Sequence, residues 1–157
     1  MNTEATKKER ERLVFEAFIK KSGLQINHES IQQPKGRSKP DIVCWQENEG
    51  KIAFELTEIC DEAVARVTST IKGSDQPVYI RGSDPTWKAR EKLKKRYETE
   101  YPVELLCYTA GRTISPGDLV RDKIRSMAEM DNGQFRRIWL LLASQGQQRD
   151  LIYLVWP

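Results

Sequence analysis

The sequence contains few of the residues on which thiol-based metal and redox sites depend. It has one histidine and three cysteines, and no two of the cysteines form a CxxC pair. Because structural zinc sites take four Cys or His ligands at short spacings, this composition argues against a Cys/His zinc site. We expect Cys44, Cys60 and Cys107 to be reduced thiols in a cytosolic protein.

Long apolar runs and several common catalytic motifs are also missing. No apolar run approaches the roughly 20 residues that a membrane-spanning helix needs. The N-terminal stretch MNTEATKKERERL is too polar for a secretory signal, so we expect a cytoplasmic protein without a membrane partner. The sequence has no glycine-rich phosphate loop, GxSxG or HExxH motif. A net charge of +3, from 26 basic and 23 acidic residues, neither demands nor excludes nucleic acid.

The patterns that are present predict one α/β domain over residues 1–157, with a central mixed sheet flanked by helices. A chain of 157 residues is long enough for one core and too short for two ordinary domains. Amphipathic and capping patterns predict helices over residues 5–21, 61–73, 85–99 and 115–133. Apolar and alternating runs predict strands over residues 24–33, 41–47, 51–59, 77–80, 102–109, 137–143 and 151–156.

The clearest local structure is a hairpin of residues 41–47 and 51–59, joined by the turn sequence ENEG. Side chains alternate along a strand, so Glu55 and Thr57 share one of its faces. In such a hairpin Asp41 and Glu55 are cross-strand or diagonal neighbours, roughly 5–8 Å apart if their side chains share a face.

Two carboxylates at that distance repel each other unless a cation lies between them. Mg²⁺ suits the gap, because it takes one or two protein carboxylates and fills its other positions with water and substrate phosphate. We therefore expect Asp41 and Glu55 to ligate Mg²⁺ or Mn²⁺, which would activate water and neutralise charge on a scissile phosphate.

Pro40-Asp41, followed by Glu55-Leu56-Thr57, resembles the motif of the PD-(D/E)xK nuclease superfamily, which has the restriction-endonuclease-like fold. The expected element order resembles that of the family from about residue 5 to about residue 110. This resemblance implies a metal-dependent nuclease that acts on nucleic acid, with DNA as the expected substrate. It leaves a homodimer open. The alternative is an inactive member of the same fold that binds DNA or protein.

The sequence departs from the family motif at Thr57, where the family carries a lysine that holds the attacking water. Threonine can hydrogen-bond a water molecule but brings no charge. The loss of a comparable electrostatic stabiliser costs on the order of 10²–10³ in rate. Three explanations stay open: another lysine has taken the role, the site works with a neutral residue, or catalysis is lost.

Among substitute lysines we favour Lys39, which lies on the face of Asp41 and roughly 7 Å from it if the chain is extended there. Together with Thr57 it would position the attacking water. Lys72, on the following predicted helix, is a second candidate, whereas Lys51 is roughly 13 Å from Glu55. A purely structural interpretation also stays open, in which Glu55 pairs with Lys39 or Lys51 across a solvated sheet face.

Basic residues are expected where a nucleic acid would approach this site. The loop sequence PKGRSK leads directly into the metal-binding hairpin. The predicted helix over residues 85–99 has a thin apolar stripe and many basic side chains, which fit a phosphate backbone as well as an ordinary solvated face. The residues that we expect to bind nucleic acid are Lys35, Arg37, Lys88, Lys92, Lys95 and Arg96.

Two further acidic residues are weaker candidates. Glu16 lies on the first predicted helix, where some members of the family carry an additional acidic residue. Yet Glu9, Arg12, Glu16 and Lys20 follow one another at three- and four-residue steps, which favours a solvated, salt-bridged face. Glu58 is expected on the sheet face opposite to the metal.

Overall fold

The structure, a computed structural model, describes four stretches of the chain: residues 3–61, 84–113, 115–143 and 150–157. The strand predicted over 77–80 and Lys72 lie outside these residues, as does nearly all of the helix predicted over 61–73. No helix in the described stretches is long and apolar enough to cross a membrane.

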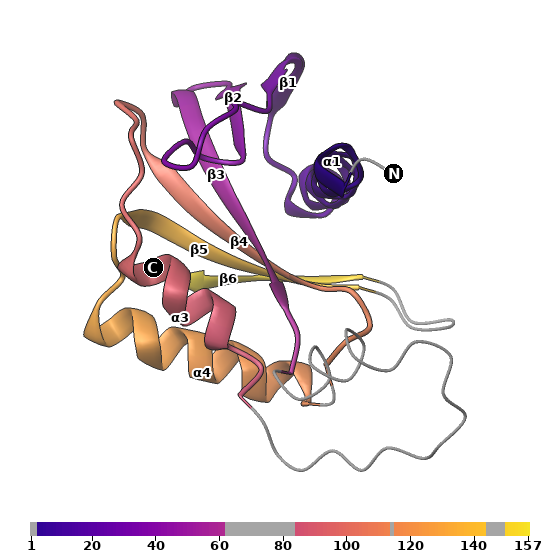
Figure 1. Cartoon of the computed structure of the whole chain (residues 1–157), viewed down its shortest axis with the longest axis vertical. Coiled ribbons are helices and arrows are strands. Elements are labelled where there is room, and N and C mark those ends of the chain that lie inside the picture. The colour runs from indigo at the N-terminus through magenta and orange to yellow at the C-terminus, as the bar shows by residue number, and fades with distance from the viewer. Residues whose placement is uncertain (1–2, 62–83, 114, 144–149) are drawn as a thin grey trace.

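Six strands of the described chain form one mixed sheet, in which they lie side by side in chain order (Figure 1). The β3–β4 and β4–β5 pairs are parallel, and the other neighbouring pairs are antiparallel. The strands are β1 (Ile26–Gln32), β2 (Ile42–Gln46), β3 (Gly50–Ile59), β4 (Val103–Thr109), β5 (Phe135–Leu142) and β6 (Leu151–Trp156).

Helices cover both faces of this sheet. Helix α1 (Thr3–Ser22) packs on one face, and α3 (Trp87–Lys94) and α4 (Gly117–Met130) pack on the other (Figure 1). On the α1 face the aromatic rings of Phe15 and Phe54 lie 5.0 Å apart. The prediction of a single α/β domain with a mixed sheet between helices is confirmed.

β3 lies in the middle of this sandwich and is buried on both faces. Phe54 and Leu56 join the core beneath α1, whereas Ala53 joins the core beneath α3 and α4. Because side chains alternate along a strand, Glu55 and Thr57 face α3. Burial on both faces is typical of a strand with a parallel neighbour and helices above and below.

Helix α3 is shorter than the sequence predicted. It covers Trp87–Lys94, and Lys95 already has extended backbone angles, φ −81° and ψ 147°. The next backbone donors find partners outside the helix: the N–H of Tyr97 donates to Oε1 of Gln134 over 2.8 Å. The prediction of a helix to residue 99 is therefore wrong at its end, because the tertiary contact at Tyr97 replaces the helical hydrogen bond.

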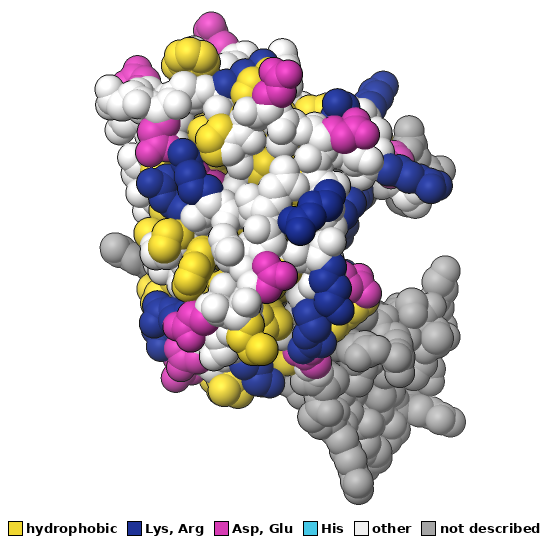
Figure 2. All heavy atoms as spheres, turned by 90° about the vertical axis from the view of Figure 1, so that its left-hand side faces the viewer, with side chains coloured by type: hydrophobic (Ala, Val, Ile, Leu, Met, Phe, Trp, Pro, Cys, Tyr) yellow, Lys and Arg dark blue, Asp and Glu magenta, His cyan; other side chains and the backbone are white. Residues whose placement is uncertain are grey.

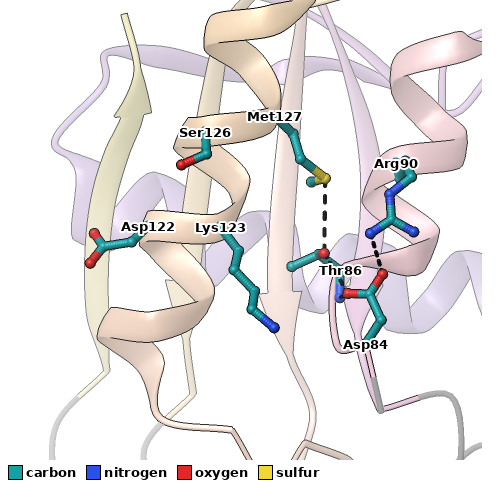
Figure 3. A pocket seen from close by; sticks show the side chains of 7 residues that line it. All are labelled: Asp84, Thr86, Arg90, Asp122, Lys123, Ser126 and Met127. Atoms are coloured by element: carbon teal, nitrogen blue, oxygen red, sulfur yellow. Dashed lines mark hydrogen bonds and ion pairs between the residues drawn. The ribbon is translucent and has the colours of Figure 1, made fainter.

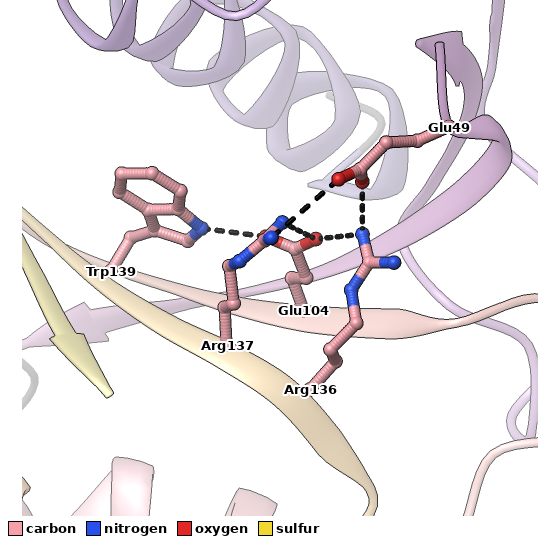
Figure 4. A network of polar contacts seen from close by, with 5 residues as sticks. All are labelled: Glu49, Glu104, Arg136, Arg137 and Trp139. Atoms are coloured by element: carbon pink, nitrogen blue, oxygen red, sulfur yellow. Dashed lines mark hydrogen bonds and ion pairs between the residues drawn. The ribbon is translucent and has the colours of Figure 1, made fainter. Parts of the chain in front are cut away.

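A buried ionic network fixes the turn of the β2–β3 hairpin to the parallel strands (Figure 4). Glu104 of β4 is fully buried and accepts hydrogen bonds from Nε1 of Trp139, over 2.7 Å, and from Arg136, over 2.6 Å. Arg136 also binds Glu49 in the hairpin turn over 2.6 Å, and Arg137 contacts both carboxylates. The network thus holds the hairpin that carries Asp41 and Glu55 against β4 and β5.

Candidate active site

The short strand β2 creates the opening in which the candidate site lies. Its first residue, Ile42, pairs with Phe54, so among the described residues β3 has no strand partner on this side beyond Phe54. Asp41 takes that place: its Oδ2 accepts a hydrogen bond of 2.9 Å from the backbone N–H of Leu56. The same register places Asp41 opposite Glu55, so the structure brings the two predicted carboxylates together.

A further carboxylate, which sequence reasoning missed, comes from α1. Glu11 is only 5% exposed and lies beside Asp41, and burial followed by charge repulsion from Asp41 raises the pKa of Glu11. The signal was present in the sequence. Glu11 precedes Phe15 by four residues and Phe18 by seven, which places it on the buried face of the helix.

Glu16, the other acidic residue of α1 that we considered for the site, does not reach it. Its carboxylate pairs with Arg12 over 2.9 Å and with Nδ1 of His28 over 3.2 Å. Glu16 therefore belongs to the salt-bridged face that the sequence favoured. Glu58 points to the sheet face opposite to Glu55, where it forms a two-pronged pair with Arg112 that lowers the Glu58 pKa against the effect of burial.

A lysine side chain from α3 contacts one of these carboxylates. Nζ of Lys92 donates a hydrogen bond of 2.7 Å to Oε1 of Glu55. Burial of the ammonium group favours its neutral form, but the attraction of Glu55 outweighs this and raises the pKa of Lys92. The sequence predicted Lys92 as a nucleic-acid contact, and nothing in the sequence alone placed it beside Glu55, 37 positions earlier.

The other lysines that were weighed lie farther from Glu55 or bind other groups. Nζ of Lys39 lies 3.6 Å from Glu98, and both side chains are well exposed. Lys51 stacks over the ring of Tyr101 at 4.6 Å from its centroid. Thr57 is buried on the same side of β3 as Glu55.

Burial and like charge act together on the two buried carboxyls. Burial and then the nearby Asp41 raise the pKa of Glu11 and that of Glu55 to about 7. Oε2 of Glu11 and Oε2 of Glu55 are both buried and have no hydrogen-bond partner in the described part of the chain. Unpaired carboxylate oxygens beside a further carboxylate are the donor set that a hard cation takes.

The arrangement does not provide a complete protein cage for a metal. No group of three or more His, Cys, Asp or Glu side chains among the described residues has the geometry to hold an ion. Asp41 and Glu55 therefore fit a cation that binds through one or two carboxylates and completes its shell with water and substrate, as Mg²⁺ does.

A cavity of about 910 Å³ opens over Asp41, Glu55 and Lys92. The loop before Asp41 forms one wall and is tied to the segment after α3, since the N–H of Glu98 donates to the carbonyl of Ser38 over 2.7 Å. The other basic side chains that line the cavity are Lys7, Lys8, Lys35, Arg37, Lys39 and Lys95.

Four of the six predicted nucleic-acid contacts thus reach this cavity, namely Lys35, Arg37, Lys92 and Lys95. Lys88 instead lies over the ring of Trp87, 5.5 Å from its centroid, and neither it nor Arg96 lines the cavity. On the face seen in Figure 2, Lys and Arg side chains alternate with Asp and Glu rather than forming one broad basic patch. Within the cavity, by contrast, basic side chains gather around the carboxylates, where they suit a phosphate.

A separate cavity of about 520 Å³ lies between α3 and α4 (Figure 3). Its carboxylates already have partners: Asp84 binds the backbone and hydroxyl of Thr86 and pairs with Arg90, and Asp122 pairs with Arg121. These contacts fasten the start of α3. This cavity therefore lacks the buried carboxylate oxygens, without hydrogen-bond partners in the described chain, that distinguish the site at Glu55.

No family model, no curated protein and no solved structure matches the chain. A functional assignment must therefore come from the chemistry of the site itself.

Proposed function

We propose that the protein is a metal-dependent phosphodiesterase that cleaves nucleic acid, with DNA as the expected substrate, on a restriction-endonuclease-like fold. The observation that carries this proposal is the 2.7 Å hydrogen bond between Lys92 and Glu55. The PD-(D/E)xK motif carries a lysine two residues after this glutamate, at the position where the present sequence has Thr57. Lys92 brings a lysine to the same carboxylate from α3. The order of α1, the hairpin, α3 and β4 also supports the proposal.

Asp41 and Glu55 are the residues that would hold Mg²⁺ or Mn²⁺. The Leu56 N–H donates to Oδ2 of Asp41 and so orients that carboxylate, and Oε2 of Glu55 has no hydrogen-bond partner among the described residues. The bound ion would supply Lewis acidity, lowering the pKa of a water molecule and neutralising charge on the phosphate. Glu11 adds negative charge that strengthens the attraction for a cation.

Lys92 takes the role for which the sequence suggested Lys39. Its ammonium group lies at the carboxylate, so it can orient the attacking water and offer positive charge as the phosphate becomes more negative. Thr57 faces the same side of β3, but it is buried and does not line the cavity. Lys39 binds Glu98 at the wall of the cavity, where, with Lys35, it meets the phosphates on either side of the scissile bond.

Plasmid cleavage with Mg²⁺, with Mn²⁺ and with EDTA tests this proposal. We expect nicking that requires the metal and that is lost in Asp41→Asn, a variant that keeps a side-chain acceptor for the Leu56 N–H. Glu16→Gln, on the solvated face of α1, is the matched control and should cleave like the wild type. Equal cleavage by the wild type and Asp41→Asn would refute the assignment.

One observation favours a second function, that of a non-catalytic module that binds DNA or protein. The ammonium group of Lys92 already neutralises Glu55, as a structural ion pair would. The two functions differ in their response to metal, because a ligand that binds only the folded state stabilises it by about 2.7 kcal/mol at 100 times its dissociation constant. A thermal transition that Mn²⁺ leaves unmoved would favour the module.

A further inference from the structure

Tyr97, three residues beyond the end of α3, is held in place by several contacts. Its N–H and carbonyl both bind the side-chain amide of Gln134, over 2.8 Å and 3.1 Å. Its ring packs against Phe135 with the centroids 5.8 Å apart, and Nζ of Lys95 lies 5.2 Å from the ring centroid. The side chain is 5% exposed. The position of the ring is thus fixed by groups that do not involve its hydroxyl.

The hydroxyl of Tyr97 is the unexplained part of this side chain. It is buried and has no hydrogen-bond partner among the described residues, and the same holds for Oε2 of Glu55. A buried hydroxyl without a partner destabilises a fold, so a phenylalanine would serve packing alone better. Contacts on both sides of Tyr97 place it at the site, because Lys92 binds Glu55 and the N–H of Glu98 donates to the carbonyl of Ser38 in the loop before Asp41. Burial and then the charge of Glu55 raise the pKa of Tyr97, so the phenol is a donor.

We propose that Tyr97 is a positioning residue whose phenol donates a hydrogen bond to Oε2 of Glu55 and orients that carboxylate for the metal. The inference rests on the metal site proposed above. Lys92 binds Oε1 of the same carboxylate, so the two donors would fix both of its oxygens. Each carboxylate oxygen has two lone pairs, which leaves room for a cation beside either donor.

Removing such an orienting donor weakens metal binding without removing a ligand. Groups that hold metal ligands in place typically contribute 10- to 100-fold to metal affinity or activity. In Tyr97→Phe we therefore expect the dissociation constant for Mn²⁺ to rise by about tenfold. The thermal stability of the metal-free protein should change little, because the loss of the hydrogen bond to Glu55 is offset by the removal of a buried polar hydroxyl.

The test is the thermal transition of the full chain measured against Mn²⁺ concentration for four proteins. These are the wild type, Tyr97→Phe, Tyr101→Phe and Asp41→Asn. Tyr101→Phe is the matched control, since that tyrosine contacts Lys51 through its ring and does not line the cavity at Glu55. We expect weakened Mn²⁺ binding in Tyr97→Phe, wild-type binding in Tyr101→Phe and none in Asp41→Asn.

Three results would overturn the inference, and the first two separate it from the proposed function. If the wild type and Tyr97→Phe bind Mn²⁺ equally while Asp41→Asn does not, the metal site stands and the role of Tyr97 is wrong. If Mn²⁺ does not stabilise the wild type, the metal site and the role of Tyr97 both fall. A lower stability of Tyr97→Phe without metal, at unchanged Mn²⁺ affinity, would assign the hydroxyl to folding alone.

Discussion

At the residue scale, Glu11 and Glu55 make the metal-free protein sensitive to pH. Burial and the neighbouring Asp41 raise both pKa values from 4.5 to about 7. Between these values the folded protein binds more protons than the unfolded chain, so the free energy of unfolding falls as pH rises. Glu58 and the other carboxyls with lowered pKa values have their effect at lower pH. Their protonation there decreases the free energy of unfolding as pH falls.

We therefore expect the free energy of unfolding, measured without metal, to decrease between pH 4.5 and 7. Glu55→Gln and Glu11→Gln should each flatten this decrease, because the amide has no charge to be repelled. Glu9→Gln, an exposed position on the same helix, is the control and should leave the slope unchanged. Slopes that are the same in the wild type and both buried variants would contradict the electrostatic description of the site.

The residues of the site differ in how far the sequence revealed them. Asp41 and Glu55 follow from a local hairpin, whose register brings them together whatever the rest of the chain does. Glu11 and Lys92 reach the site through the packing of α1 and α3 on opposite faces of the sheet, and sequence periodicity does not fix such long-range contacts. Glu11 was nevertheless detectable as a charge on an apolar helix face.

At the scale of elements, the network around Glu104 holds the β2–β3 turn to the parallel strands. Glu104→Ala leaves Arg136 and Trp139 without their buried acceptor, so we expect unfolding to become easier by roughly 3–5 kcal/mol. Urea unfolding measures this change. Glu100→Ala, at an exposed position before β4, is the control, with an effect within about 0.5 kcal/mol. A similar small loss in Glu104→Ala would mean that the hairpin is held by other contacts.

The sequence predicted the type of a helix or strand well where local patterns determine it. It predicted the residues at which these elements end less well. The runs over 102–109 and 151–156 became β4 and β6 almost as predicted, since apolar strands are bounded by clear turn residues. Helix α3 ended early because the Tyr97 N–H binds Gln134, a residue 37 positions later. Local helix propensity cannot predict such a long-range contact, so the early end of α3 could not be predicted from the sequence.

At the scale of the whole molecule, binding to nucleic acid should depend on the basic cavity more than on the net charge. Each phosphate contact contributes about 0.9 to the slope of log affinity against log salt for B-form DNA. We expect Lys35→Ala and Arg37→Ala to reduce that slope by about this amount each, measured on DNA with EDTA present. Lys20→Ala, exposed on α1 and outside the cavity lining, should leave it unchanged. Equal slopes in all four proteins would place the binding surface elsewhere.

The overall architecture followed from the sequence only in outline. Alternating patterns of strands and helices predicted an α/β domain, and the sheet order of β1 to β6 agrees with that class. The pairing directions of the last three strands depend on where α4 crosses between β4 and β5, a choice that apolar patterns do not encode.

The central claim, that Lys92 replaces the lysine missing at Thr57, is tested most directly by comparing Lys92→Met with Lys94→Met in metal-dependent cleavage. The two lysines lie two positions apart on α3, but only Lys92 binds Glu55 and lines the cavity. We predict a loss on the order of 10²–10³ in rate for Lys92→Met and wild-type cleavage by Lys94→Met. Full activity in Lys92→Met, with metal-dependent cleavage intact, would contradict the claim and return the role to another group.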